Sequence, residues 1–257
     1  QFGPRRAIEK IIIELSETEE SECNDSYPSS EIPTLGKEQI LSSLLKGNMI
    51  PFIRQRPFNR VINPSDTPRD IFISGWNTAP LSVNLDVALR RRLPQFQAGI
   101  NILKQLTSGA VHLSINENTV SDTLLEINGA EIHTINGPHP AGNVGIQIHH
   151  IAPLKLNDLV WTVNAQDVAR IGSFFLTGRY DPTLFVTVGG PGVKVPTHIK
   201  TRAGVQLESI LSDNLNKGKQ RIISGDVLTG KTADNNGYLG FYDSTVSVIP
   251  EGGEREF

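Results

Sequence analysis

The residues of this chain that could most readily bind a metal or transfer a proton are its histidines. Four of the six histidines lie within residues 133–150. Imidazole nitrogens bind metal ions and exchange protons near neutral pH. His139 with His149 or His150 is therefore a candidate metal pair. Against it, residues 136–150 contain no carboxylate, and adjacent histidines on a strand point to opposite faces. We expect ordinary loop or core histidines and no metal site.

The segment 137–150 itself is more informative than its histidines. Three glycines and two prolines make it a rigid, glycine-punctuated loop, which is expected to run into a short apolar strand. A loop of this composition presents one shape and suits recognition. Its candidate ligand or interface residues are His139, Pro140, Gly142 and His149.

The same loop resembles the Gly-Pro-His-Pro-Ala-Gly loop of the A subunit of the sodium-translocating NADH:quinone reductase, a bacterial respiratory complex. Further stretches agree with this family, in the same order along the chain, at residues 54–58, 164–168, 175–178, 223–230 and 238–242. Agreement in order over nearly the whole chain is much stronger than any one motif. The chain departs from the family at Gln147, where members often carry histidine, and this weakens any role for a histidine pair.

The resemblance implies a peripheral subunit at the cytoplasmic face of the bacterial inner membrane. Its implied partners are the other subunits of the complex, especially the quinone-side membrane subunit. The whole complex would pass electrons from NADH to quinone and export sodium, while this chain scaffolds and associates with quinone and is inactive alone. The alternative is a scaffold subunit of a related Rnf-type electron-transport complex, whose C subunit carries cysteine clusters further along its chain.

The segment that begins at Arg54 is the best candidate for a quinone or subunit contact. Arg54 and Arg56 can donate to a carbonyl whose negative charge grows on reduction. Pro57 sets the loop, and Phe58 offers an aromatic face to a ring. The competing interpretation is that the arginines form surface or interface salt bridges.

The cofactor motifs that the sequence lacks are as informative as those it has. The single cysteine excludes an internal disulfide and a cysteine-ligated iron–sulfur cluster. No G-x-G-x-x-G motif opens a helix, and the expected strand 71–74 runs into Gly75-Trp76-Asn77 without a carboxylate. In layout the chain resembles the complex I flavoprotein subunit with its FMN or FAD motifs missing. Any redox chemistry would then have to come from a bound quinone or from neighbouring subunits.

Composition excludes other classes of protein. A net charge of −3 gives no reason to expect nucleic-acid binding. No run approaches the roughly 18 apolar residues that span a bilayer.

We also expect Trp76 to fill a core, and Tyr238 and Tyr242 to cap the core of the last domain. Ser224 precedes a turn and has no histidine near it in sequence, so no nucleophile is expected there.

The alternation of strands and helices predicts an α/β fold, and the later order of hairpin, helix and strands predicts a β-grasp module. The family resemblance implies that the first part is a Rossmann-like layer and that the second is a β-grasp (soluble-ligand-binding) domain. Helices are expected at 37–46, 85–106 with a break at Pro94, 120–127, 166–176 and 205–211. Strands are expected at 71–74, 110–115, 131–135, 184–188, 197–201, 221–224 and 245–249. The expected parts are a strand from a preceding barrel-like domain (1–15), an acidic linker (16–33), the α/β domain (34–180) and the β-grasp domain (181–257).

Overall fold

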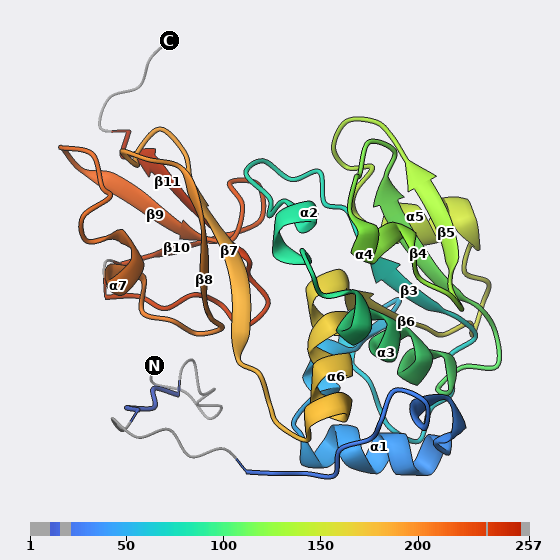
Figure 1. Ribbon diagram of the computed structural model, residues 1–257. Helices are drawn as coiled ribbons and strands as arrows, with labels where there is room; N and C mark the ends of the chain where they lie inside the picture. The colour runs from blue at the N-terminus through green and yellow to red at the C-terminus, as the bar shows by residue number, and fades with distance from the viewer. Residues whose placement is uncertain (1–10, 16–21, 235, 253–257) are drawn as a thin grey trace, which may run out of the picture.

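The computed structural model describes residues 11–15, 22–234 and 236–252, which form two units, each with its own sheet (Figure 1). The helices and strands of the first unit are η1 (Ile32–Thr34), α1 (Lys37–Lys46), η2 (Ile50–Phe52), β1 (Arg54–Arg56), β2 (Arg60–Val61), β3 (Ile71–Ser74), α2 (Leu85–Ala88), α3 (Leu93–Lys104), β4 (Val111–Asn116), α4 (Asp122–Leu125), β5 (Glu131–Ile135), α5 (Val144–Ile151), β6 (Val160–Asn164) and α6 (Ala165–Thr177). Those of the second are β7 (Thr183–Gly189), β8 (Thr197–Arg202), α7 (Leu207–Leu211), β9 (Gln220–Ser224), β10 (Lys231–Ala233) and β11 (Thr245–Pro250). Within the described ranges, no helix is both long and apolar enough to cross a membrane.

The first sheet has the strand order β2-β1-β6-β3-β4-β5. Strands β6, β3, β4 and β5 are parallel, and β1 pairs antiparallel with β6. In chain order the parallel strands read 3-2-1-4 from β5 to β6, which are the first four strands of the Rossmann order. This arrangement confirms the expected α/β fold class.

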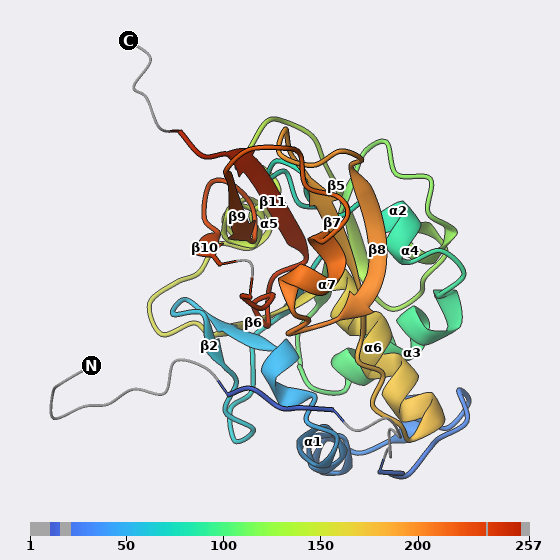
Figure 2. The ribbon, with the colours of Figure 1, turned by 90° about the vertical axis from the view of Figure 1, so that its left-hand side faces the viewer.

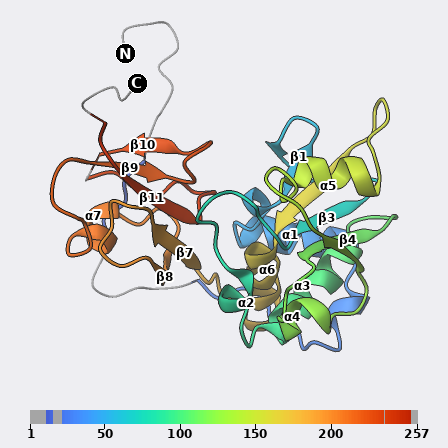
Figure 3. The ribbon, with the colours of Figure 1, turned by 90° about the horizontal axis from the view of Figure 1, so that it is seen from above.

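Helices cover both faces of this sheet, with α3 and α6 on one face and α5 on the other (Figure 3). The central strands are therefore almost continuously apolar, as buried parallel strands are. Helices α3 and α6 cross closely because Gly99 and Gly172 lie at the contact. A Cβ atom on Gly172 would lie only 1.8 Å from the carbonyl oxygen of Gln95.

Helix α5 corrects one expectation, because residues 144–151 are helical and not a strand. The apolar residues Val144, Ile148 and Ile151 have helical spacing and pack with Phe72 and Val160 of the sheet. The same run also has apolar residues at alternate positions 144, 146 and 148, so its pattern fits a strand as well as a helix. Burial against the sheet selected the helix.

The second unit has the strand order β10-β9-β11-β7-β8, and it faces the viewer in Figure 2. Strands β7 and β8 form a hairpin, α7 follows, and the last strand, β11, lies parallel to the first, β7. In chain order these strands read 4-3-5-1-2, which is β-grasp connectivity. The core contains Leu207 of α7 and apolar residues of the central strands, such as Val186 and Val248.

The amino-terminal expectations need two corrections. The expected strand lies partly outside the described residues, and its described part, 11–15, forms no strand and exposes Ile11 by 77%. The acidic segment is not an unpacked linker throughout. The amides of Asn24 and Tyr27 donate to carbonyl oxygens at the end of α6, both at 2.8 Å, and Ile32 is fully buried.

Candidate functional site

A cavity of about 510 Å³ opens where β3 and β6 end. Ser74 ends β3 and Asn164 ends β6, and the two strands are parallel neighbours. The chain continues from β3 to β4 on one side, whereas β6 lies on the other side. This is the topological switch point, where open α/β sheets bind their ligands. The volume is within the usual range for small-molecule sites.

Two helices begin at the wall of this cavity. Residues 143–146 at the start of α5 and residues 164–167 at the start of α6 both line it. Neither Asn143 nor Asn164 caps its helix with its side chain. The first backbone N–H groups of a helix lack intrahelical partners and carry partial positive charge. The wall therefore favours an anionic or strongly polarised oxygen.

Arg56 adds a full positive charge to the same wall. It lines both this cavity and an adjoining one of about 210 Å³, which Arg54 also lines. Its Nε is buried without a hydrogen-bond partner, and no carboxylate among the described residues pairs with it. Burial, and next the charge of Arg54, lower the pKa of Arg56. Among the described residues, neither Arg54 nor Arg56 forms a salt bridge within the chain, and an interface salt bridge with another subunit stays the competing interpretation.

The β-grasp unit closes the cavity through Tyr242 and its neighbours. The guanidinium carbon of Arg54 lies 4.4 Å from the centre of the Tyr242 ring, and the Tyr242 hydroxyl donates to the carbonyl of Pro51 at 3.2 Å. Phe241 stacks on Phe52 with ring centres 5.5 Å apart. The expectation that Tyr242 caps the β-grasp core is wrong, because it packs against the first unit.

A buried ion pair lies at the base of α6. Arg170 donates from Nη1 to Asp167 at 3.1 Å, from Nη2 to the Tyr180 hydroxyl at 3.1 Å and from Nε to the Asp181 carbonyl at 3.2 Å. Burial raises the pKa of Asp167 to about 6, although Arg170 opposes that shift. The pair and its contacts fix the amino-terminal turn of α6 at the cavity.

The predicted glycine-rich loop reaches the cavity through Gly142. Its amide donates to Thr78 Oγ1 at 2.9 Å, and its carbonyl accepts from Gln147 Nε2 at 3.1 Å. His139 Nδ1 lies 3.1 Å from the same Thr78 oxygen but does not line the cavity. Pro140 is exposed beside it. His149 is exposed on α5, next to His150 in the sequence, and is not on a strand.

The remaining predicted residues lie outside this cavity. Pro57 is in the exposed turn after β1, and Phe58 is 73% exposed, with the Arg60 guanidinium carbon 5.5 Å from its ring centre. The sequence interpretation missed Trp76, which lines the cavity and is only partly buried instead of filling a core. Its signal was its position two residues after the end of a buried strand.

Ser224 shows no nucleophilic arrangement. Its hydroxyl donates to Asp243 at 2.6 Å and accepts from the Gly240 amide at 2.8 Å. Gly225 follows with a φ of 99°, as the expected turn requires. These bonds tie the end of β9 to the loop that contains Gly240 and Asp243.

Comparison with solved structures supports the fold. The chain is similar to an NAD⁺-reducing [NiFe]-hydrogenase in its air-oxidized state, with a TM-score of 0.55 and 13% identity over 90% of this chain and 52% of that one. The hydrogen-reduced state gives a TM-score of 0.57 and 14% identity over 86% and 48%. At such identities the likeness concerns the fold alone.

Comparison with curated sequences is closer. Proteins named as the A subunit of the Na⁺-translocating NADH-quinone reductase match 99% of this chain. Those from Serratia proteamaculans and Pseudomonas aeruginosa are 35% identical to it, and the one from Rhodopirellula baltica is 36% identical. The chain spans 56–57% of the length of these relatives.

Family models divide the chain as its two sheets do. The model described as the NqrA second alpha/beta domain matches residues 35–180, and the model described as the NQRA C-terminal domain matches residues 185–235. The first match alone covers more than half of the chain. The chain therefore belongs to the NqrA family, the A subunits of the Na⁺-translocating NADH-quinone reductases.

Proposed function

We propose that this chain is part of a peripheral subunit of a sodium-pumping NADH:quinone oxidoreductase and that its switch-point cavity binds the quinone headgroup. The assembly as a whole transfers electrons from NADH to quinone and exports sodium. This chain contributes binding and scaffolding and no catalytic side chain. Its partners are the other subunits, especially the quinone-side membrane subunit, at the cytoplasmic face of the bacterial inner membrane. The names of the relatives support this function over an Rnf-type scaffold.

The observation that carries the quinone proposal is the unpaired Arg56 at the cavity. A quinone carbonyl is a hydrogen-bond acceptor that gains negative charge on reduction, so a cationic donor favours the reduced forms. The first turns of α5 and α6 add partial positive charge on the same wall. Trp76 and Phe241 supply apolar ring surface to the cavity.

The proposal includes no flavin and no iron–sulfur cluster in this chain. A bound flavin nucleotide needs a phosphate loop in which glycines let the backbone approach the ligand. The loop after β3 instead brings the side chains of Trp76 and Asn77 to the cavity. Cys23 is the single cysteine of the chain, and it is exposed.

The test replaces Arg56 in the assembled complex. Arg56→Ala removes a charged donor, an interaction worth about 1.5–3 kcal/mol, so quinone kcat/KM should fall by about tenfold or more. NADH oxidation with an artificial acceptor should be unchanged. Arg60→Ala is the matched control, because Arg60 is an exposed arginine of the same hairpin and lies outside both cavities. Normal quinone kinetics in Arg56→Ala would reject the quinone site, and loss of assembly would identify this hairpin as a subunit interface.

A further inference from the structure

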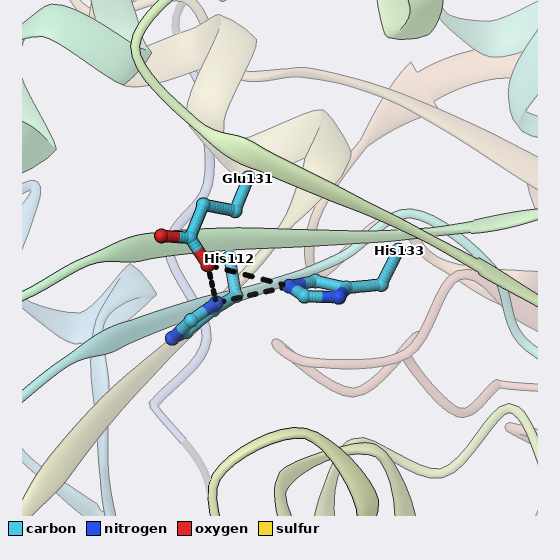
Figure 4. A group of neighbouring side chains, drawn as sticks. All are labelled: His112, Glu131 and His133. Carbon is cyan, nitrogen blue, oxygen red and sulfur yellow. Dashed lines mark hydrogen bonds and ion pairs between the residues drawn. The ribbon is translucent and has the colours of Figure 1, made fainter.

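A cluster of His112, Glu131 and His133 lies on the first sheet, separate from the switch-point cavity. His112 is on β4, and the other two residues are on the neighbouring strand β5. The parallel register pairs His112 with Glu131 and Ser114 with His133. Because side chains alternate along a strand, Glu131 and His133 share a face, and His112 shares it with them. Figure 4 shows the three side chains converging.

The donor atoms have the spacing that a small metal ion requires. His112 Nδ1 lies 3.0 Å from His133 Nε2 and 3.3 Å from Glu131 Oε2. His133 Nε2 and Glu131 Oε2 are 4.0 Å apart. Ligands at about 2.0–2.1 Å from a tetrahedral zinc ion are separated by roughly 3.3 Å. Small side-chain rotations would equalise the three distances around an ion.

We propose that His112, Glu131 and His133 form a Zn²⁺ site that ties the edge strand β5 to β4. Two imidazole nitrogens and one carboxylate oxygen are a ligand set that suits zinc, whereas Mg²⁺ and Ca²⁺ prefer oxygen ligands. Among the residues that the structure describes, this is the one group of three such side chains found within ligand spacing.

The surroundings of the cluster suit a site that is rigid on one side and open on the other. The His112 side chain is 7% exposed, and its ring centre lies 4.6 Å from that of Phe72, which fixes its orientation. The side chains of His133 and Glu131 are 29% and 63% exposed, so an ion can enter from solvent. Three protein ligands leave a fourth position for water or for a donor from another molecule.

The alternative is a metal-free cluster in which the imidazoles and the carboxylate share hydrogen bonds. The experiment titrates Zn²⁺ into the full chain, without an oligohistidine tag and after chelator treatment, and follows the heat of binding. We expect one saturable Zn²⁺ per chain and no comparable Mg²⁺ binding. A large excess of Zn²⁺ over Kd should raise Tm by roughly 5–10 °C, because the ion binds only the folded pairing of β4 and β5.

Two variants on the exposed side of the cluster avoid disturbing the buried His112. His133→Ala and Glu131→Gln should each weaken Zn²⁺ binding by at least about tenfold, with unchanged circular dichroism. His150→Ala is the control, because His150 is an exposed histidine outside the cluster, and it should bind as the wild type does. Absence of saturable binding, or equal binding by all variants, would overturn the proposal. Loss in His150→Ala as large as in His133→Ala would do the same, by indicating adventitious binding to surface histidines.

Discussion

Replacing Gly142 by alanine tests the close contact between the glycine-rich loop and the loop after β3. A Cβ atom at position 142 would lie 2.3 Å from the amide nitrogen of Thr78 and 2.8 Å from its Oγ1. Ordinary van der Waals contact requires about 3.5 Å. The nearest of these atoms belongs to the backbone, so the loops must separate by about 1 Å.

The energetic consequence can be worked out from this geometry. Overpacking of this kind costs about 1–3 kcal/mol, and the hydrogen bond from the Gly142 amide to Thr78, worth about 1 kcal/mol, is strained or lost. Alanine also lowers the conformational entropy of the unfolded chain, which stabilises the folded state by about 0.4–1 kcal/mol. We expect a net loss of about 1–3 kcal/mol and a fall in Tm of about 4–8 °C for the middle of that range.

Gly145→Ala is a matched control in the first turn of α5. Nothing lies within 4 Å of a Cβ atom at position 145, and alanine favours a helix over glycine by about 0.5–1 kcal/mol. The two substitutions should therefore change stability in opposite directions. Both tryptophans, Trp76 and Trp161, lie in the first unit, so urea unfolding followed by tryptophan fluorescence reports on this unit. A Gly142→Ala chain as stable as the wild type would refute the close contact.

Two further predictions concern α6. The pKa of Asp167 is about 6 in the folded chain, against an ordinary value of 3.8, so the folded state holds this proton to higher pH than the unfolded state does. Its contribution to stability is fully present below the unfolded pKa of 3.8 and is lost as pH rises through 6. The unfolding free energy of the wild type minus that of Asp167→Asn should therefore fall by about 2 kcal/mol from pH 4 to pH 7, and a flat difference would contradict the shift. Gly172→Ala would place a Cβ atom 1.8 Å from the Gln95 carbonyl oxygen and 2.6 Å from the Gly99 nitrogen. It should lower the free energy of unfolding by about 1–3 kcal/mol, measured by urea unfolding, and a gain like that of Gly145→Ala would contradict the crossing geometry.

Local patterns in the sequence determined most of the helices and strands. The apolar spacing of Ile40, Leu41 and Leu44 predicted α1 with the bounds that the structure has, and Gly47 marked its end. The predicted break at Pro94 appears as the separation of α2 from α3, because proline is tolerated only in the first turn of a helix. In the second unit, the order of hairpin, helix and strands predicted the β-grasp connectivity.

Tertiary structure decided what local pattern left ambiguous. The run from Val144 fits both a strand and a helix, and only its packing on Phe72 selects the helix. Trp76 and Tyr242 were both expected in cores. They instead border one cavity, although 166 positions separate them in the chain, because the carboxyl ends of β3 and β6 meet the β-grasp unit there.

The histidines show the same division between sequence and fold. The sequence drew attention to the dense cluster of histidines in residues 133–150, but among the described residues only His133 of that cluster belongs to a group of three side chains within ligand spacing. The spacing of Glu131 and His133 on one strand was readable, since alternate residues share a face. Their third partner, His112, is 19 positions earlier than Glu131, and only the parallel register of β4 and β5 brings it alongside. Sequence determined which side chains were available and their local spacing, whereas strand pairing determined which of them meet.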